Sequence, residues 1–236
     1  MPIVIANPSI PVTWASEIAA DNPVFWAKLD ETSGVPAADS GSAGLSGSYV
    51  NSPTLGEAPL INAGTSVELN GTTQRVDFPV SVNQFYDQTM TFEAWVNMST
   101  LQQCGIFHVG DTSAGAGSIG YNFYITSTGA LRFNSYDSGF FGAVTSGNYI
   151  TSTSTTYHVA YKVNAPGNVR FYVNGSFVEQ VAYAHTVGLH GSHPIHLGSV
   201  KGGSYGNFLA GHIDEVVWFN TLLDDSRILA HYNAGV

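Results

Sequence analysis

The chain has 236 residues, of which 44% are hydrophobic and only 10% are charged, and its formal net charge is −10. This length suits one large all-β domain with its own core, and the acidic balance argues against nucleic-acid and anionic-membrane partners. The single cysteine, Cys104, excludes an intrachain disulfide, and no stretch reaches the roughly 18 apolar residues that span a membrane.

Residues 1–19 are expected to form an N-terminal arm, because their first part, MPIVIANPSIPVTW, is extended, apolar and interrupted by proline. Such an arm docks on a partner or has no fixed structure. It lacks the basic and long apolar regions of a secretory signal, so we expect synthesis in the cytoplasm without a signal peptide. A short helix is predicted within WASEIAADNP, before Pro23.

Two long segments alternate strictly between two kinds of side chain, which predicts half-buried antiparallel strands. In residues 89–98, one face carries Met90, Phe92, Ala94 and Val96. In residues 157–163, one face carries Tyr157, Val159, Tyr161 and Val163. Residues 168–181 predict a hairpin, because Asn174 and Gly175 can take the positive φ angles of a two-residue turn.

Shorter strands are predicted at residues 75–80, 122–126, 130–135, 194–200 and 212–219. Turn residues separate them, a rhythm typical of a sandwich or jelly roll. The segment 224–235 predicts a C-terminal helix. In it Asp224 is the N-cap, Gly235 is the end, and one face carries Ile228, Leu229 and Tyr232. The expected fold is therefore an all-β, two-sheet antiparallel jelly-roll sandwich over residues 20–236, with a short C-terminal helix.

Seven motifs carry a family resemblance. They are NPVFWAKLDETSG (22–34), AADSGSAGLSG (37–47), SVELNGTTQRVDFP (66–79), TMTFEAWV (89–96), YHVAYKV (157–163), VRFYVNG (169–175) and GHIDEVVWFNTLLDDSRILAHYNAG (211–235). In this order they resemble the laminin-G-like, concanavalin-A-like jelly-roll family. The resemblance implies two antiparallel sheets, one of them concave, in a carbohydrate-binding module, an adhesion domain or a phage tail. The segments 15–34 and 226–235 are similar to domains in minor tail proteins of phages that infect actinobacteria.

The acidic residues do not show the pattern of a glycosidase. Jelly-roll glucanases carry acid–x–Asp–x–acid on one face of a strand, which brings two carboxyls within about 5 Å. Here one face is expected to carry His212, Asp214 and Val216, and the other Ile213, Glu215 and Val217. Glu93 has no acidic partner two or four residues away. We therefore expect no enzymatic activity.

One structural calcium ion is implied by the resemblance, since Ca²⁺ takes six to eight oxygen ligands. Carried over by position, its ligands would be Asp39, Asp214 and Glu31, with carbonyls from residues 41–44. The loop reads Asp-Ser-Gly-Ser-Ala-Gly where the family has Asp-x-Ser-Gly-Asn-Gly, so one candidate ligand is missing. The alternative is that Asp39 caps a turn and Asp214 accepts backbone N–H bonds.

Neither the histidines of residues 185–196 nor Cys104 shows the pattern of a metal or catalytic site. The histidines His185, His190, His193 and His196 lie along one loop, without the paired spacing of a zinc site, so they are expected to be ordinary surface residues of that loop. Cys104 has no base beside it in the sequence, so a buried, inert thiol is expected.

A glycan site would combine aromatic rings with planar polar groups on an outward face or on rim loops. The candidates are Trp95, Tyr172 and Arg170 on strands, and Tyr136 and Tyr205 on loops. The alternative is that loops fold over the sheet and bury these rings.

The expected function is that of a non-enzymatic, lectin-like virion protein. As a minor tail component it would act outside the cell, contact a host-surface glycan and bind other virion proteins or further copies of itself. A structural decoration or fibre subunit that binds only virion proteins is one alternative. A carbohydrate-binding module of a polysaccharide-active system is another.

Overall fold

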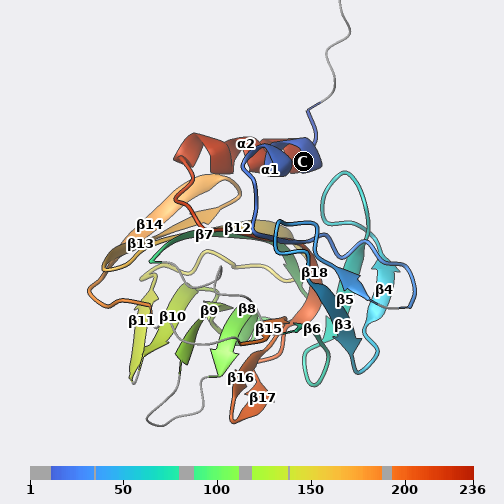
Figure 1. The fold of residues 1–236 in the computed structure, drawn as a ribbon, viewed down its shortest axis with the longest axis horizontal. Coiled ribbons are helices and arrows are strands. Elements are labelled where there is room, and N and C mark those ends of the chain that lie inside the picture. Colours follow the sequence, from blue (N-terminus) through green and yellow to red (C-terminus); the bar gives the residue numbers. More distant parts are fainter. Residues whose placement is uncertain (1–11, 35, 80–87, 112–118, 138, 188–192) are drawn as a thin grey trace, which may run out of the picture.

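Two antiparallel sheets lie face to face, and two helices lie on the outer side of one of them (Figure 1). This is a computed structural model, and it describes residues 12–34, 36–79, 88–111, 119–137, 139–187 and 193–236. Within these ranges, no helix has the length and apolar character needed to cross a membrane. The predicted fold class, a two-sheet antiparallel sandwich with a short C-terminal helix, is confirmed.

The first sheet, called sheet A here, lies beneath the helices. Its strands are β1 (Phe25–Ala27), β4 (Thr54–Glu57), β5 (Ser66–Asn70), β7 (Thr89–Met98), β12 (Thr156–Asn164), β13 (Gly167–Val173), β14 (Ser176–Tyr183) and β18 (Ala210–Phe219). They follow the order β14-β13-β12-β7-β18-β5-β4, and β1 also pairs with β18.

The second sheet, sheet B, closes the other side of the core. Its strands are β2 (Ala37–Ala38), β3 (Ser46–Val50), β6 (Arg75–Phe78), β8 (Cys104–Asp111), β9 (Ile119–Ile125), β10 (Leu131–Asp137), β11 (Phe140–Val144) and β15 (Ile195–Leu197). Their order is β11-β10-β9-β8-β15-β6-β3-β2. A separate hairpin follows β15 and consists of β16 (Val200–Gly202) and β17 (Ser204–Gly206).

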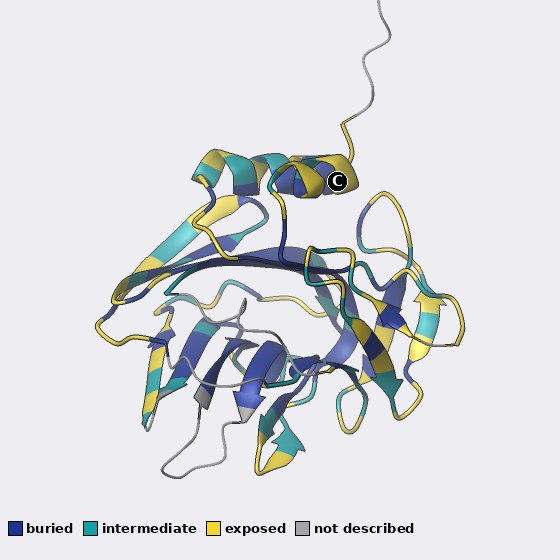
Figure 2. Ribbon diagram, in the orientation of Figure 1, coloured by how far each residue is buried: buried dark blue, intermediate teal, exposed yellow. Residues whose placement is uncertain are grey.

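The main core lies between the two sheets, where buried residues follow both layers in Figure 2. The four apolar residues predicted to share a face of β7 all contribute to it, as do the four of β12. Phe92 of sheet A stacks on Phe123 of sheet B with ring centroids 4.4 Å apart. The predicted hairpin is also confirmed, because Asn174 and Gly175 have φ angles of 51° and 72° between β13 and β14.

A second apolar layer lies on the outer face of sheet A, under α1 (Trp14–Ala20) and α2 (Asp225–Gly235) (Figure 1). Trp14 and Ile18 of α1 are fully buried there. The boundary expected at residue 20 is therefore placed too late, since from Trp14 onward the chain packs on the domain. Residues 1–11 of the expected arm lie outside the described residues.

The C-terminal helix differs in detail from its prediction. Asp224 is its N-cap residue but makes no side-chain capping hydrogen bond, and Gly235 lies inside the helix. Ile228 and His231 face the sheet, whereas Leu229 is 44% exposed. The buried face thus includes an ionisable histidine in place of the predicted leucine.

A β-bulge in β18 changes the predicted division of its faces. The pairing with β7 shifts between Asp214 and Val217, and Glu215 takes a left-handed φ of 49°. Ile213 therefore shares the main core with Val216, while Val217 packs in the layer beneath the helices. Strict alternation is wrong here because an extra residue in a strand reverses the faces that follow it.

Candidate functional site

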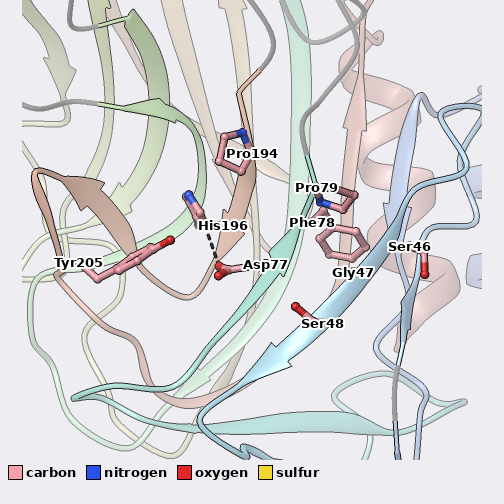
Figure 3. A pocket seen from close by; sticks show the side chains of 9 residues that line it. All are labelled: Ser46, Gly47, Ser48, Asp77, Phe78, Pro79, Pro194, His196 and Tyr205. Carbon is pink, nitrogen blue, oxygen red and sulfur yellow. Dashed lines mark hydrogen bonds and ion pairs between the residues drawn. The ribbon is translucent and has the colours of Figure 1, made fainter.

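A groove of about 340 Å³ lies over β6 and β15 on the outer side of sheet B. Figure 3 shows strand β3 on one side of it and Tyr205 of the β16–β17 hairpin on the other. Its lining residues are Ser46, Gly47, Ser48, Asp77, Phe78, Pro79, Pro194, His196 and Tyr205.

The polar floor of this groove is formed by Asp77 and His196, which strand pairing and the alternation of side chains bring together. Asp77 pairs directly with His196 across the β6–β15 ladder. The neighbours of each residue along its own strand are buried apolar side chains of the main core. Because side chains alternate along a strand, Asp77 and His196 must both point away from that core.

Asp77 is the electrostatic centre of the groove. Its Oδ1 lies 2.6 Å from Nδ1 of His196, and Nε of Arg75 donates to both of its carboxylate oxygens at 3.0 Å. Burial alone would raise the pKa of Asp77, but the hydrogen bonds and charges of His196 and Arg75 outweigh it and lower that pKa. The carboxylate is therefore ionised at neutral pH.

The aromatic wall is Tyr205, in the middle of β17 of the β16–β17 hairpin. Its ring lies edge-to-face with the His196 ring, with centroids 5.1 Å apart. The guanidinium of Arg75 lies 3.5 Å from its ring centroid, a cation–π distance that holds the ring in place. On the opposite wall, a methyl group at Gly47 would come within 2.8 Å of the Phe78 ring, so β3 approaches closely only with glycine there.

A row of polar side chains continues from this floor across sheet B. His196 pairs with His108, His108 with Asn122, and Asn122 with Asn134 in successive ladders. All four are buried, and Asn134 donates to Asn122 at 2.9 Å. A buried polar band thus runs along the outer side of the sheet, and the groove lies at one end of it.

The predicted glycan-binding residues divide between the two sheets. Tyr205 lines the groove, and Tyr136 lies further along sheet B on β10, with its ring 5.4 Å from that of Phe140. Trp95 and Tyr172 are buried to 1% and 0% exposure in the layer under the helices. The prediction that they lie on an open face is wrong. Their side chains point away from the main core, as predicted, but α1 and α2 cover that side of sheet A.

Arg170 also lies on the helix side, where its guanidinium donates to both carboxylate oxygens of Asp225 at 3.0 and 2.8 Å. Lys162 and the Tyr172 hydroxyl bind the same carboxylate. Asp225 opens α2, so this cluster attaches the helix to sheet A. Arg170 therefore stabilises the helix layer, and both terminal nitrogens of its guanidinium already bind Asp225.

A buried charge network joins both helices to sheet A. Glu93 accepts from His158 Nε2 at 3.0 Å and lies 3.0 Å from His231 Nδ1 of α2. His231 Nε2 lies 2.9 Å from Asp21 at the end of α1. Burial raises the pKa of Glu93, but the charge of His231 and hydrogen bonds from both histidines lower it to about 2.

The three expected calcium ligands are engaged separately. Asp39 accepts three backbone N–H bonds, from Trp26, Gly41 and Leu45. Glu31 accepts from the Ala38 N–H and the Tyr49 hydroxyl.

Asp214 Oδ2 accepts from the Leu60 N–H at 2.9 Å, while its buried Oδ1 has no hydrogen-bond partner among the described residues. Burial raises the pKa of Asp214 to about 8 and that of Glu215 to about 7. Each of the three acids thus has its own hydrogen-bond donors, and the described residues contain no group of three or more His, Cys, Asp or Glu side chains that could hold a metal ion. The arrangement does not fit a calcium ion held by all three acids.

The histidines expected to be ordinary loop residues have distinct surroundings. His185 stacks on Phe141 with ring centroids 3.6 Å apart, and His196 belongs to the groove. His190 lies outside the described residues. Cys104 is buried, as expected, and burial raises the pKa of its thiol to about 12.

Asp77 and the groove role of His196 are not among the residues predicted from the sequence. Each carries a recognisable signal, a polar side chain between two core residues of a short strand. Their partnership could not be predicted, because Asp77 and His196 are 119 positions apart in the sequence and only the β6–β15 ladder places them side by side. The network of Glu93, His158 and His231 could not be predicted for the same reason, since its members are far apart in the sequence.

Comparison with known proteins gives the fold a context. The chain is similar to the binding domain of botulinum neurotoxin serotype D, with a TM-score of 0.67, 13% identity, and 92% of this chain and 52% of that chain covered. It is similar to domain 4 of AbnA, a GH43 extracellular arabinanase from Geobacillus stearothermophilus, solved in complex with arabinotriose. For this domain the TM-score is 0.66 and the identity 17%, and the match covers 89% of this chain and 98% of the arabinanase domain.

The binding domain of botulinum neurotoxin DC in complex with SialylT is also similar, with a TM-score of 0.65, 15% identity, and 91% and 52% covered. The chain thus spans about half the length of the neurotoxin domains. No curated protein matches the sequence. Residues 70–229, most of the chain, match the concanavalin A-like lectin/glucanases superfamily, and the chain therefore belongs to this family.

Proposed function

We propose that this chain is a non-enzymatic carbohydrate-binding domain whose ligand lies in the groove between β3 and the β16–β17 hairpin. The observation that carries the proposal is the convergence of Asp77, His196 and Tyr205 on one hollow of about 340 Å³. Small-ligand sites are concave, and a few converging polar groups beside aromatic or apolar walls set their specificity.

Two structurally similar domains support a sugar ligand. Domain 4 of AbnA was solved with arabinotriose, and the binding domain of neurotoxin DC was solved with SialylT. The present chain shares their fold at low identity, so the ligand is proposed from its own groove and not transferred residue by residue.

The burial of the acidic residues supports a non-enzymatic role. Asp214 and Glu215 are 1% and 5% exposed, and Glu215 accepts the indole N–H of Trp26. Glu93 is fully buried beneath the helices. A glycosidase needs two carboxyls that flank a bound glycosidic bond, and none of these three faces the groove.

The test is a glycan array probed with the purified chain, followed by calorimetric titration of the bound glycans. Tyr205→Ala removes the aromatic wall and should weaken binding at least tenfold. Phe177→Ala is the matched control, because it removes a 47% exposed ring from β14 of the other sheet. Binding unchanged by Tyr205→Ala would place the site elsewhere, and silence across the array would refute carbohydrate binding.

For the biological setting we propose a phage tail, in which the chain contacts a host-surface glycan and is anchored to other virion proteins. The support is the resemblance of segments 15–34 and 226–235 to domains of minor tail proteins. Mass spectrometry of purified particles should detect the chain at a constant copy number per particle. Its absence from particles of a phage that encodes it would refute this setting.

A further inference from the structure

We infer that the groove between β3 and the β16–β17 hairpin selects an uncharged sugar unit and rejects the acidic form of the same sugar. The inference rests on the proposed function and names its ligand class. It is carried by the distribution of charge around Asp77 and by the hydrogen-bonding capacity that this residue retains.

The lining of the groove contains a carboxylate and no permanent cation. Asp77 is the only Asp or Glu among the nine lining residues, and none of them is Lys or Arg. His196, the one other ionisable side chain on the floor, already directs its Nδ1 at Asp77 from 2.6 Å. Proteins that recognise a carboxylate or a sulfate usually place Arg or Lys against it, and this lining offers neither.

The nearest cation is already committed to the wall of the groove. Arg75 donates its Nε to both oxygens of Asp77 and lays its guanidinium on the Tyr205 ring, 3.5 Å from the centroid. Lys201, on the same hairpin, has its Nζ 5.9 Å from that centroid and has an interaction partner of its own. These contacts hold Asp77 and Tyr205 in position, and within the Arg75–Asp77 pair the carboxylate is the more exposed side chain, at 21% against 13%.

Asp77 keeps room for one more donor. A carboxylate has about four acceptor positions, and the hydrogen bonds described use three of them, two on Oδ1 and one on Oδ2. The remaining position on Oδ2 suits a sugar hydroxyl, because a hydroxyl donates a short, strong bond to an ionised acceptor. A carboxylate or sulfate on the ligand would instead meet like charge on a protein of net charge −10.

A second hydroxyl can be bound from the neighbouring strand. Ser48 lies directly opposite Asp77 in the β3–β6 ladder, so the two side chains stand about 5 Å apart on the same face. The Ser48 hydroxyl both donates and accepts. One sugar ring with adjacent hydroxyls can therefore bond Asp77 and Ser48 together, with Tyr205 beside it.

The experiment compares sugars that differ by one charge. Neutral glycans that bind on the array, together with galactose and glucose, are titrated at pH 7 beside matched acidic forms, with galacturonic acid and glucuronic acid as the partners that differ only by a carboxylate at C6. We expect each neutral sugar that binds to do so at least tenfold more tightly than its acidic form. Asp77→Asn should weaken neutral binding and reduce that difference, with a thermal melt to verify that the variant is folded.

A gain-of-binding variant keeps the test independent of the Asp77 variant. Ser48→Arg places a guanidinium on an exposed position of the groove wall and should raise affinity for the acidic sugars about tenfold. Ser176→Arg is its matched control, because it adds the same charge at an exposed position on β14. Equal acidic-sugar binding by these two variants would overturn the inference.

The remaining outcomes separate this inference from the proposed function. An acidic glycan that binds wild-type protein as tightly as its neutral form, and is lost with Tyr205→Ala, overturns the inference while the groove remains a sugar site. Failure of every glycan, neutral and acidic, to bind refutes the proposed function itself.

Discussion

Replacement of Glu93 by glutamine tests how the helix layer is held on sheet A. The carboxylate is fully buried and meets His158 Nε2 at 3.0 Å and His231 Nδ1 at 3.0 Å. Glutamine has nearly the same shape as glutamate but carries no charge. Its NH₂ group would also lie against the N–H of one of the two histidines, where the carboxylate had accepted a hydrogen bond. Removing one partner of a buried ion pair costs about 3–5 kcal/mol of unfolding free energy. Because the remaining oxygen of glutamine can still accept one hydrogen bond, we expect a loss of about 3 kcal/mol.

This loss should be visible as a change in thermal stability. For a chain of this size, 1 kcal/mol shifts the Tm by roughly 2–4 °C, so Glu93→Gln should melt about 6–12 °C lower. Glu68→Gln, an exposed substitution on β5 of the same sheet, should stay within about 0.5 kcal/mol of wild type. Urea titrations of both variants give the free energies of unfolding directly.

The difference should also follow pH with a defined sign. The pKa of Glu93 lies at about 2, below its ordinary 4.5, so the ionised carboxylate stabilises fully above about pH 4.5 and loses its effect as pH falls through about 2. Burial lowers the pKa of His231, but the charge and hydrogen bond of Glu93 outweigh it and raise that pKa above 6.5. The stabilisation from His231 is therefore complete below pH 6.5 and is lost at higher pH.

The gap between wild type and Glu93→Gln should be largest at pH 5–6. A loss below about 1 kcal/mol at that pH, or one no larger than that of Glu68→Gln, would refute the view that this network holds the helices. Hydrogen exchange provides the second readout, because a weakened network should raise exchange in α1 and α2 before it does so in sheet B.

Three further predictions follow from the packing and the buried acids. Burial raises the pKa of Asp214 to about 8, and an acid with a raised pKa destabilises the fold as pH rises toward that value. The Tm should therefore fall from pH 5 to pH 8, and Asp214→Asn should flatten the fall; an unchanged slope would contradict this. Gly47→Ala should destabilise by about 1–3 kcal/mol, because its methyl group would lie 2.8 Å from the Phe78 ring. Gly206→Ala is its control, because a methyl group there meets nothing within 4 Å. Equal urea midpoints for the two variants would show that β3 does not pack tightly against Phe78. Calcium and EDTA should leave the Tm unchanged, because Asp39 already accepts three backbone N–H bonds and Asp214 accepts one from Leu60; a rise of several degrees with Ca²⁺ would show that a cation binds at Asp214.

Much of the sandwich could be predicted because its evidence is local. The period-two pattern of residues 89–98 decides which face of β7 is buried, since alternation follows from strand geometry alone. Asn174 and Gly175 specify their hairpin for an equally local reason, the positive φ angles that a tight turn requires. Low charge and frequent turn signals then leave few alternatives to two facing antiparallel sheets.

The site could not be predicted in the same way. Period two says that Trp95 points away from the main core, but it does not say whether water or another layer lies there. Only the packing of α1 and α2 decided that Trp95 is buried, while Tyr205 on the opposite side lines a groove. A strand pattern defines two faces of a sheet and carries no information about what covers the second.

By itself, then, the sequence determined the fold class, the inner faces of β7 and β12, and the β13–β14 hairpin, because these follow from spacing along one strand or turn. Tertiary structure alone decided the bulge that reverses β18 after Asp214 and the ladder that brings Asp77 to His196. It also decided the network that joins Glu93 to His231. Each of these depends on register between strands or helices far apart in the chain, and register is set by packing of the whole core rather than by any local pattern.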